Sequence, residues 1–197
     1  MKTISTTLFI AVIAFSANIV ISQRRGAGVT DVDGNFYKTI RVKKTEWMAD
    51  NLRTLHYSNG QVIESNSGIG FYTWLEITND QGVCPIGWRV PSNKDWDELA
   101  DYFGGGDVAA IDLKDNWDKS WMVSYQEATN YSGFSAHPHG YLNENGKLNN
   151  KGKYAYWWSS EAAEEETAWG REIGFNQDIL YKGYASKKDG LSVRCVK

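Results

Sequence analysis

The residues best suited to chemistry are few in this chain of 197 residues. The only imidazoles belong to His56, His137 and His139, so general bases for catalysis are in short supply. Ser159 and Ser160 adjoin a tryptophan pair, but no Gly-x-Ser-x-Gly turn surrounds them, and strand-end hydroxyls are the better interpretation. The sequence offers no catalytic constellation, and we expect a protein that is not an enzyme.

A metal site is the next possibility. His137 and His139 lie two residues apart, so in an extended segment both rings point to one side, and Glu144 or Asp189 would complete a ligand set. An ordinary zinc site needs three protein ligands, so a loop with surface imidazoles is favoured. The acidic run that begins at Glu161 invites calcium, but a solvated hairpin loop explains it more simply. We expect no cofactor, with calcium as the open alternative.

Paired carboxylates are another route to catalysis. Glu161 and Asp189 would serve as general acid and base for cleavage of a glycosidic bond if the fold held them within about 10 Å of each other in one cleft. An enzyme or enzyme-accessory domain acting on surface polysaccharide is therefore an alternative function.

Aromatic side chains are the most abundant binding resource, with nine Trp and eleven Tyr. Aromatic faces suit sugar rings and partner proteins alike. Trp157 and Trp158 are neighbours on a predicted strand and face opposite sides, so one indole is a candidate for exposure unless both faces are covered. Core packing is the competing interpretation for every Trp. The candidate ligand-binding residues are Trp117, Trp121, Tyr125, Tyr131, Tyr141 and Trp158.

The first 22 residues have the pattern of a secretory signal peptide. Lys2 precedes an apolar core at 8–15 that is too short for a membrane span. Cleavage after Ser22 is favoured over cleavage after Ser16. We therefore expect a secreted, periplasmic or cell-surface protein with no stable membrane span after cleavage.

Cys84 and Cys195 are the only cysteines. In an exported chain they have one possible intramolecular pairing, and a disulfide that closes so long a loop stabilises a fold by about 4 to 5 kcal/mol in the entropic view. Neither cysteine lies near a cleavage site, which argues against a lipid anchor.

Charge makes nucleic acid a poor partner. Removal of residues 1–22 takes away one of 21 basic residues and none of the 24 acidic ones, for a net charge of −4 (20 − 24). The basic residues are dispersed, whereas binding to DNA or RNA depends on clustered Lys and Arg. Roughly 175 residues remain, enough for one domain with its own core.

The local patterns predict an α+β fold. Asp-Gly at 33–34 indicates a hairpin turn, and alternation over 36–42 indicates a half-buried strand. Ser92 as N-cap, with Asp95 in the capping-box position, predicts a helix that ends at Gly104.

In the C-terminal third of the chain, apolar residues recur with a period of two, as in strands. A weak helical turn at 108–114 precedes it, and Leu191, Val193 and Cys195 share one face of the last strand, which places the disulfide on the buried side. The predicted antiparallel strands cover 154–160, 168–175, 179–184 and 191–197.

Six motifs occur in order along the chain, at 47–52, 72–74, 84–96, 130–136, 156–160 and 190–196. The third begins with Cys-Pro-Ile-Gly-Trp-Arg-Val-Pro-Ser at Cys84. Taken together, these motifs resemble the Fibrobacter succinogenes major paralogous domain. One departure is His-Pro-His-Gly-Tyr at 137–141, where the family usually has Leu-Pro-Gly-Gly-Tyr. The resemblance implies a bacterial, exported protein of C-type-lectin-like fold, with an antiparallel sheet, two helices and long irregular loops. The family has no settled activity.

These observations define the expected organisation and function. Residues 1–22 are a signal peptide, 23–30 a flexible lead-in and 31–197 the lectin-like domain. The leading hypothesis is a noncatalytic recognition module that binds an extracellular glycan or partner protein through the aromatic-rich stretch 116–141. The polysaccharide-directed enzyme and a purely structural surface or matrix component are the alternatives.

Overall fold

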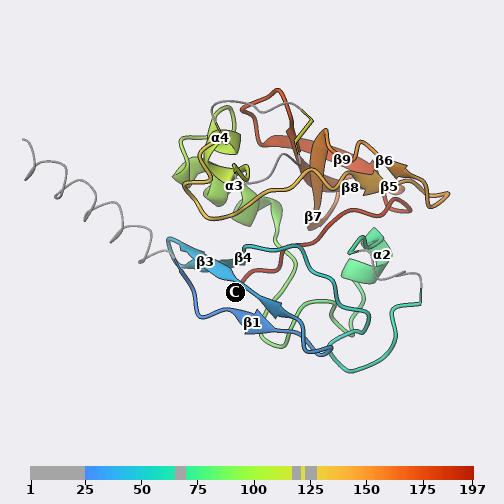
Figure 1. Ribbon diagram of the computed structural model, residues 1–197. Helices are drawn as coiled ribbons and strands as arrows, with labels where there is room; N and C mark the ends of the chain where they lie inside the picture. The colour runs from blue at the N-terminus through green and yellow to red at the C-terminus, as the bar shows by residue number, and fades with distance from the viewer. Residues whose placement is uncertain (1–24, 65–69, 117–120, 123–127) are drawn as a thin grey trace, which may run out of the picture.

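The computed structural model describes residues 25–64, 70–116, 121–122 and 128–197. Figure 1 shows N-terminal hairpins below, a three-stranded sheet above with helices beside it, and the C-terminus returning to lie against β3 and β4. Several small antiparallel sheets and three helices in these residues confirm the α+β class. No described helix is both long and apolar enough to cross a bilayer.

The N-terminal part consists of two antiparallel hairpins. Asp31 organises the first turn, because its carboxylate accepts the backbone N–H groups of Asp33 and Asn35 and the Tyr37 hydroxyl. The alternation predicted over 36–42 breaks because Thr39 and Ile40 are both buried, and the predicted strand is divided in two at Lys38. The strands are β1 (Val29–Thr30), paired with β2 (Phe36–Tyr37), and β3 (Thr39–Val42), paired with β4 (Thr45–Met48).

The expectation of a flexible lead-in at 23–30 needs correction. Arg25 forms a bridge with Ile40, and the Gly28 N–H donates to the Thr39 hydroxyl. Residues 25–30 are thus hydrogen-bonded to the hairpins, and the ordered domain begins before residue 31.

Helix α3 (Asn93–Tyr102) is the element that the sequence predicts best. The Ser92 side chain accepts the N–H of Asp95, and the Asp95 carboxylate accepts the N–H of Ser92, which completes the capping box. Trp96 and Leu99 on one face of the helix are fully buried. The pattern therefore confirms both the start of the helix and its inward face.

Two further helices are short. The predicted turn at 108–114 is confirmed as α4 (Ala109–Leu113). Helix α2 (Trp74–Ile77) was not expected, although Thr73 and Glu76 form a capping box there as well. In the sequence, only the capping box indicates this helix, because a single helical turn is too short to show helical periodicity.

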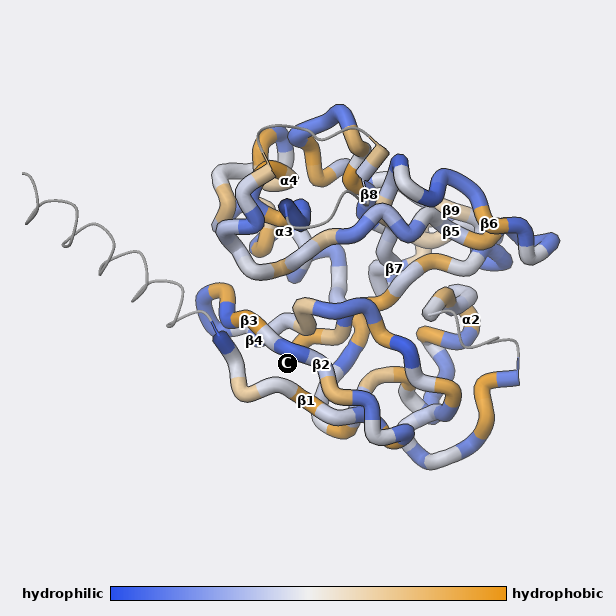
Figure 2. The backbone as a smooth tube through the Cα atoms, in the orientation of Figure 1, coloured by the Kyte–Doolittle hydropathy of each residue, from blue (hydrophilic) through white to orange (hydrophobic). Residues whose placement is uncertain are grey.

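The main sheet has the order β7-β8-β9, all antiparallel. A small hairpin precedes it, and Figure 2 shows its hydrophilic turn projecting from the body of the molecule. The sheet strands are β7 (Tyr154–Ala162), β8 (Thr167–Gly174) and β9 (Tyr181–Ser186), and the hairpin strands are β5 (Tyr141–Leu142) and β6 (Leu148–Asn149).

Both faces of β7 are covered, which explains the adjacent tryptophans. Trp157 packs with Trp96 of α3 and with Phe134 in one apolar cluster, whereas Trp158 belongs to a second cluster that contains Tyr72 and the disulfide. Both indoles are fully buried. Because both faces are covered, neither indole is the exposed aromatic for which the sequence made one of them a candidate.

The segment 191–197 joins the two halves of the molecule. It was predicted to be a strand of the main sheet, but the sheet has three strands and this segment forms isolated bridges instead. Ser192 exchanges backbone hydrogen bonds with β7, while the N–H of Met48 in β4 donates to Cys195 and Glu46 exchanges two hydrogen bonds with Lys197. Residues 191–196 are all buried, so alternation did not distinguish two faces.

Arg194 is buried between two aromatic rings in this joint. Its guanidinium carbon lies 3.9 Å from the ring centre of Phe134 and 5.5 Å from that of Trp157. Nε donates to Oδ1 of Asn51 at 2.8 Å, and the terminal nitrogens donate to the carbonyls of Phe134 and Ser135. Burial lowers the pKa of Arg194, and the charges of two nearby carboxylates offset part of that shift.

The Asn51 amide holds this network in one orientation. Its Oδ1 accepts hydrogen bonds from Nε of Arg194 and from Nε1 of Trp157, at 2.9 Å. Both partners only donate, so the oxygen must face them and Nδ2 must face Ser192 Oγ and His139 Nδ1. One side chain thereby connects four segments that are distant in sequence.

The disulfide between Cys84 and Cys195 confirms the predicted pairing, across a sequence separation of 111 residues. We expect the double variant Cys84→Ala/Cys195→Ala to lower the free energy of unfolding by about 4 kcal/mol, because the open chain regains the entropy of a long loop. Urea denaturation of both proteins measures the difference. A loss below about 1 kcal/mol would show that hydrogen bonds alone hold the C-terminal segment.

Candidate functional site

The aromatic residues nominated from sequence do not share one surface. Trp117 and Tyr125 lie outside the described residues. Trp121 is only 6% exposed and belongs to the core, with the Lys114 ammonium 5.5 Å from its ring centre. Tyr131 is exposed beside a separate cleft of about 810 Å³ that the chain around Gly26 also lines.

Trp158 is removed from the candidate ligand-binding residues. Its indole N–H donates to the backbone carbonyl of Tyr72 at 2.6 Å, and the side chain has no exposed surface. Tyr141 is the nominated aromatic that lines a cleft on the sheet, and the candidate site is built around it.

The floor of this cleft consists of two glycines. Gly170 on β8 and Gly183 on β9 are direct cross-strand partners on the face of the sheet that Trp158 also occupies. A Cβ on Gly170 would lie 2.8 Å from the carbonyl oxygen of Trp157, so no larger residue fits there. Because neither position carries a side chain, a cavity of about 380 Å³ opens above the strands.

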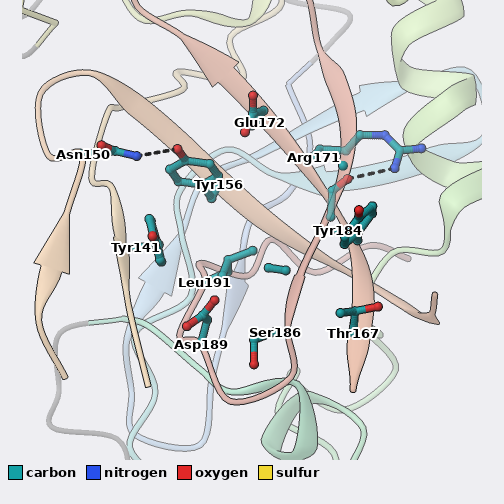
Figure 3. Close-up of a pocket in the computed structure, with 13 residues that line it drawn as sticks. Tyr141, Asn150, Tyr156, Thr167, Arg171, Glu172, Tyr184, Ser186, Asp189 and Leu191 are labelled. Carbon is teal, nitrogen blue, oxygen red and sulfur yellow. Dashed lines mark hydrogen bonds between the residues drawn. The ribbon is translucent and has the colours of Figure 1, made fainter. Parts of the chain in front are cut away.

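We call this cavity the tyrosine cleft, because two tyrosines form one of its walls. Tyr141 from β5 and Tyr156 from β7 meet edge to face, with ring centres 5.2 Å apart. The Tyr156 hydroxyl accepts a hydrogen bond from Asn150 Nδ2 at 2.8 Å, which fixes the ring (Figure 3). Burial, with the nearby charge of Glu172, raises the pKa of Tyr156 to about 12, so this phenol stays neutral.

Two carboxyl groups lie at the ends of this wall. Glu172 is the cross-strand partner of Tyr156, and Asp189 follows β9 next to the hairpin (Figure 3). Burial raises the pKa of Glu172, and burial together with the charge of Glu144 raises that of Asp189. Aromatic faces flanked by half-buried carboxylates, an amide and hydroxyl groups favour a ligand with a flat apolar face and many hydroxyls.

A second cavity of about 470 Å³ shares the hairpin with the first. Tyr141 and Asn150 line the tyrosine cleft, whereas Leu148 and Lys151 line the second cavity. His137 and His139 line this second cavity as well, together with Asp50, Asn51, Leu52, Arg53, Gly70, Phe71, Ser192 and Arg194. We call it the basic cleft.

Each of the two cleft histidines has a different partner. Nε2 of His137 lies 3.2 Å from a carboxylate oxygen of Asp115. Nδ1 of His139 lies 3.1 Å from Nδ2 of Asn51 and must accept its hydrogen, so the proton of the neutral imidazole sits on Nε2. Partial burial, with the positive charges of His137, Arg194 and Lys151, lowers the pKa of His139 to about 4.

The other sequence-based candidates do not meet. Glu161 accepts hydrogen bonds from the backbone and side chain of Asn93 at the start of α3, and it lines neither cleft. The proposed pair of Glu161 and Asp189 is therefore not assembled in the tyrosine cleft. Within the part of the chain that the structure describes, no three metal-ligand side chains lie close enough to hold an ion.

Comparison with known families identifies the domain. Residues 40–197 match the Fibrobacter succinogenes major domain. The chain belongs to this family. The match confirms the resemblance read from the six motifs and includes every residue that lines the two clefts, while β1 and β2 precede it. No curated protein matches the chain.

Sequence reasoning missed most of the tyrosine cleft of this Fibrobacter succinogenes major domain. The visible signal was a glycine inside each of two strands, at 170 and 183, which often marks a close approach or an open site. The pairing of these glycines depends on the strand register, which the isolated strand patterns did not specify.

The pKa of His139 makes a pH dependence testable. Because the folded-state pKa of about 4 lies below the unfolded value of roughly 6.5, the unfolded chain takes up this proton first as the pH falls. This group therefore costs no stability above about pH 6.5 and lowers the free energy of unfolding progressively between about pH 6.5 and 4.

We expect His139→Asn, which keeps an acceptor near the position of Nδ1, to lose less stability on acidification than the unchanged protein. Urea denaturation at about pH 7 and about pH 4.5 measures both losses, and all other titrating groups are common to the two proteins. Equal losses would contradict the assignment of a neutral, hydrogen-bonded His139.

Proposed function

We propose that the protein is an exported, noncatalytic recognition module that binds an extracellular glycan through the tyrosine cleft. The observation that carries this proposal is the pair of glycines beside Tyr141 and Tyr156, because it leaves a cavity of about 380 Å³ between aromatic and carboxyl groups. A lectin-like relationship of the fold is part of the same proposal.

The proposal of export rests on two independent features. The first 22 residues have the composition of a signal peptide, with one basic residue before an apolar core. The Cys84–Cys195 disulfide is the kind of bond that persists in oxidising compartments and is rare in the cytosol. Together they favour a secreted, periplasmic or cell-surface location.

The chemistry of the tyrosine cleft favours a sugar over a purely apolar ligand. The side chains of Glu172 and Asp189 supply hydrogen-bond acceptors for hydroxyl groups, and the Tyr156 hydroxyl can still donate. The edge-to-face arrangement of the two tyrosines presents an apolar surface beside these polar groups. Hydroxyl groups around an apolar ring face match this combination.

Recognition without reaction is the simpler use of this cleft. The carboxyl pair nominated from sequence is divided between the cleft and the start of α3, and no histidine lines the cleft. Binding needs only the fixed tyrosine wall and the polar groups at its ends. A partner protein in place of a glycan remains the alternative ligand class for the same surface.

The most direct test places a side chain in the tyrosine cleft by replacing one of its two glycines. In Gly183→Val the new side chain projects into the tyrosine cleft, where its Cβ meets only the ring of the exposed Tyr181, at 3.1 Å. A screen of the unchanged protein against neutral glycans identifies the best ligand, and isothermal titration then measures its affinity. We expect Gly183→Val to weaken binding by at least about tenfold while the unfolding temperature stays the same or rises.

The matched control is Lys182→Val, which places the same side chain one residue earlier, on the opposite face of β9. It should bind the neutral glycan as the unchanged protein does, and mass spectrometry should recover the oligosaccharide intact. Full affinity in Gly183→Val, or no binding of any neutral glycan, would reject the proposed function. Shortened oligosaccharide would indicate an enzyme.

A further inference from the structure

The basic cleft is rich in hydrogen-bond donors that have no acceptor. His139 accepts at Nδ1, so its Nε2–H is free to donate, and the Ser192 hydroxyl accepts from Asn51, so its own proton remains available. Among the described residues neither proton has an acceptor. The Lys151 ammonium is exposed, and no described carboxylate lies within ion-pair distance of it.

The charge of the basic cleft, like its free hydrogen-bond donors, favours an anionic ligand. Arg53, Lys151 and Arg194 line the cleft against one carboxylate, that of Asp50, so the cleft carries a formal charge of +2 (3 − 1) in a protein whose net charge is −3. Cavities lined by one sign of charge concentrate the electrostatic potential. Burial lowers the pKa of His139, and the positive charges of His137, Arg194 and Lys151 lower it further because they disfavour a protonated ring.

Arg194 strengthens the argument because it is a buried cation without a direct counter-charge. Its partners are the Asn51 amide and two backbone carbonyls, and no carboxylate of the described chain lies within ion-pair distance. Buried charges in proteins are normally paired. An anion in the adjoining cleft would reduce this imbalance.

We propose that the basic cleft binds the carboxylate of a uronate residue and is the subsite for the acidic sugar of an extracellular glycan. Lys151, Ser192 and His139 supply donors to the carboxylate, and Phe71 and Leu148 supply an apolar surface for the sugar ring. This inference rests on the proposed glycan-binding function.

Proximity to the tyrosine cleft favours a glycan over other carboxylates. Leu191 and Ser192 are consecutive, yet the first lines the tyrosine cleft and the second lines the basic cleft. Asn150 and Lys151 divide in the same way. Two cavities that border the same two segments of the chain, one suited to a neutral ring and one to an acidic ring, fit an oligosaccharide in which both kinds of sugar occur.

The test compares two ligands that differ in charge. Trigalacturonate and its fully methyl-esterified form are titrated by isothermal calorimetry into the unchanged protein and into Lys151→Gln. We expect the acid to bind at least about tenfold more tightly than the ester, and Lys151→Gln to remove most of that preference. NMR of the histidine rings should show the Nε2 resonance of His139 shifting with the acid alone.

Lys153→Gln is the matched control, because Lys153 is an exposed lysine two residues away that does not line the basic cleft. It should leave the preference for the acid unchanged. Equal affinity for acid and ester, equal effects of the two lysine variants, no binding of the acid at about 10 mM, or tighter binding of a hexaglutamate peptide would each overturn the proposal. Gly183→Val distinguishes this inference from the proposed function. The variant should weaken binding of the neutral glycan to the tyrosine cleft, and it should leave the acid-induced shift of the His139 resonance unchanged.

Discussion

The shared hydrogen bonds of the Asn51 amide are the constraint on which the rest of the structure depends. Its oxygen accepts from the buried side chains of Arg194 and Trp157, and its nitrogen donates to Ser192 and His139. Each of the two buried donors, Arg194 and Trp157, would cost about 1 to 3 kcal/mol if it had no acceptor. The C-terminal segment can therefore enter the core only where this side chain receives it, and the disulfide then secures that position.

The same joint creates the two candidate binding surfaces. The C-terminal segment crosses between the main sheet and the N-terminal hairpins, so Leu191 lines the tyrosine cleft and Ser192 lines the basic cleft. Arg194 brings positive charge to the second cavity, while paired glycines of the sheet open the first. Core packing and surface chemistry are thus properties of one set of neighbouring residues, and a change in the joint should affect both clefts.

Local signals predicted the parts of this fold that local interactions determine. The capping box at Ser92 located α3, and the two cysteines predicted the disulfide. Patterns failed where tertiary contacts decide the outcome. Residues 191–196 are buried whichever way they face, so their alternation could not indicate an exposed face, and Trp158 is buried because a second apolar cluster covers its face. The tyrosine cleft depends on the register of Gly170 with Gly183, which only the assembled sheet reveals.

A double-mutant cycle between Asn51 and Arg194 tests the central claim most directly. Urea denaturation of Asn51→Ala, Arg194→Lys, the double variant and the unchanged protein gives the coupling free energy of the two side chains. If the amide and the guanidinium form one unit, each single variant loses about 2 kcal/mol or more, and the double variant loses at least about 1 kcal/mol less than their sum. Losses that add to within about 0.3 kcal/mol would contradict the account.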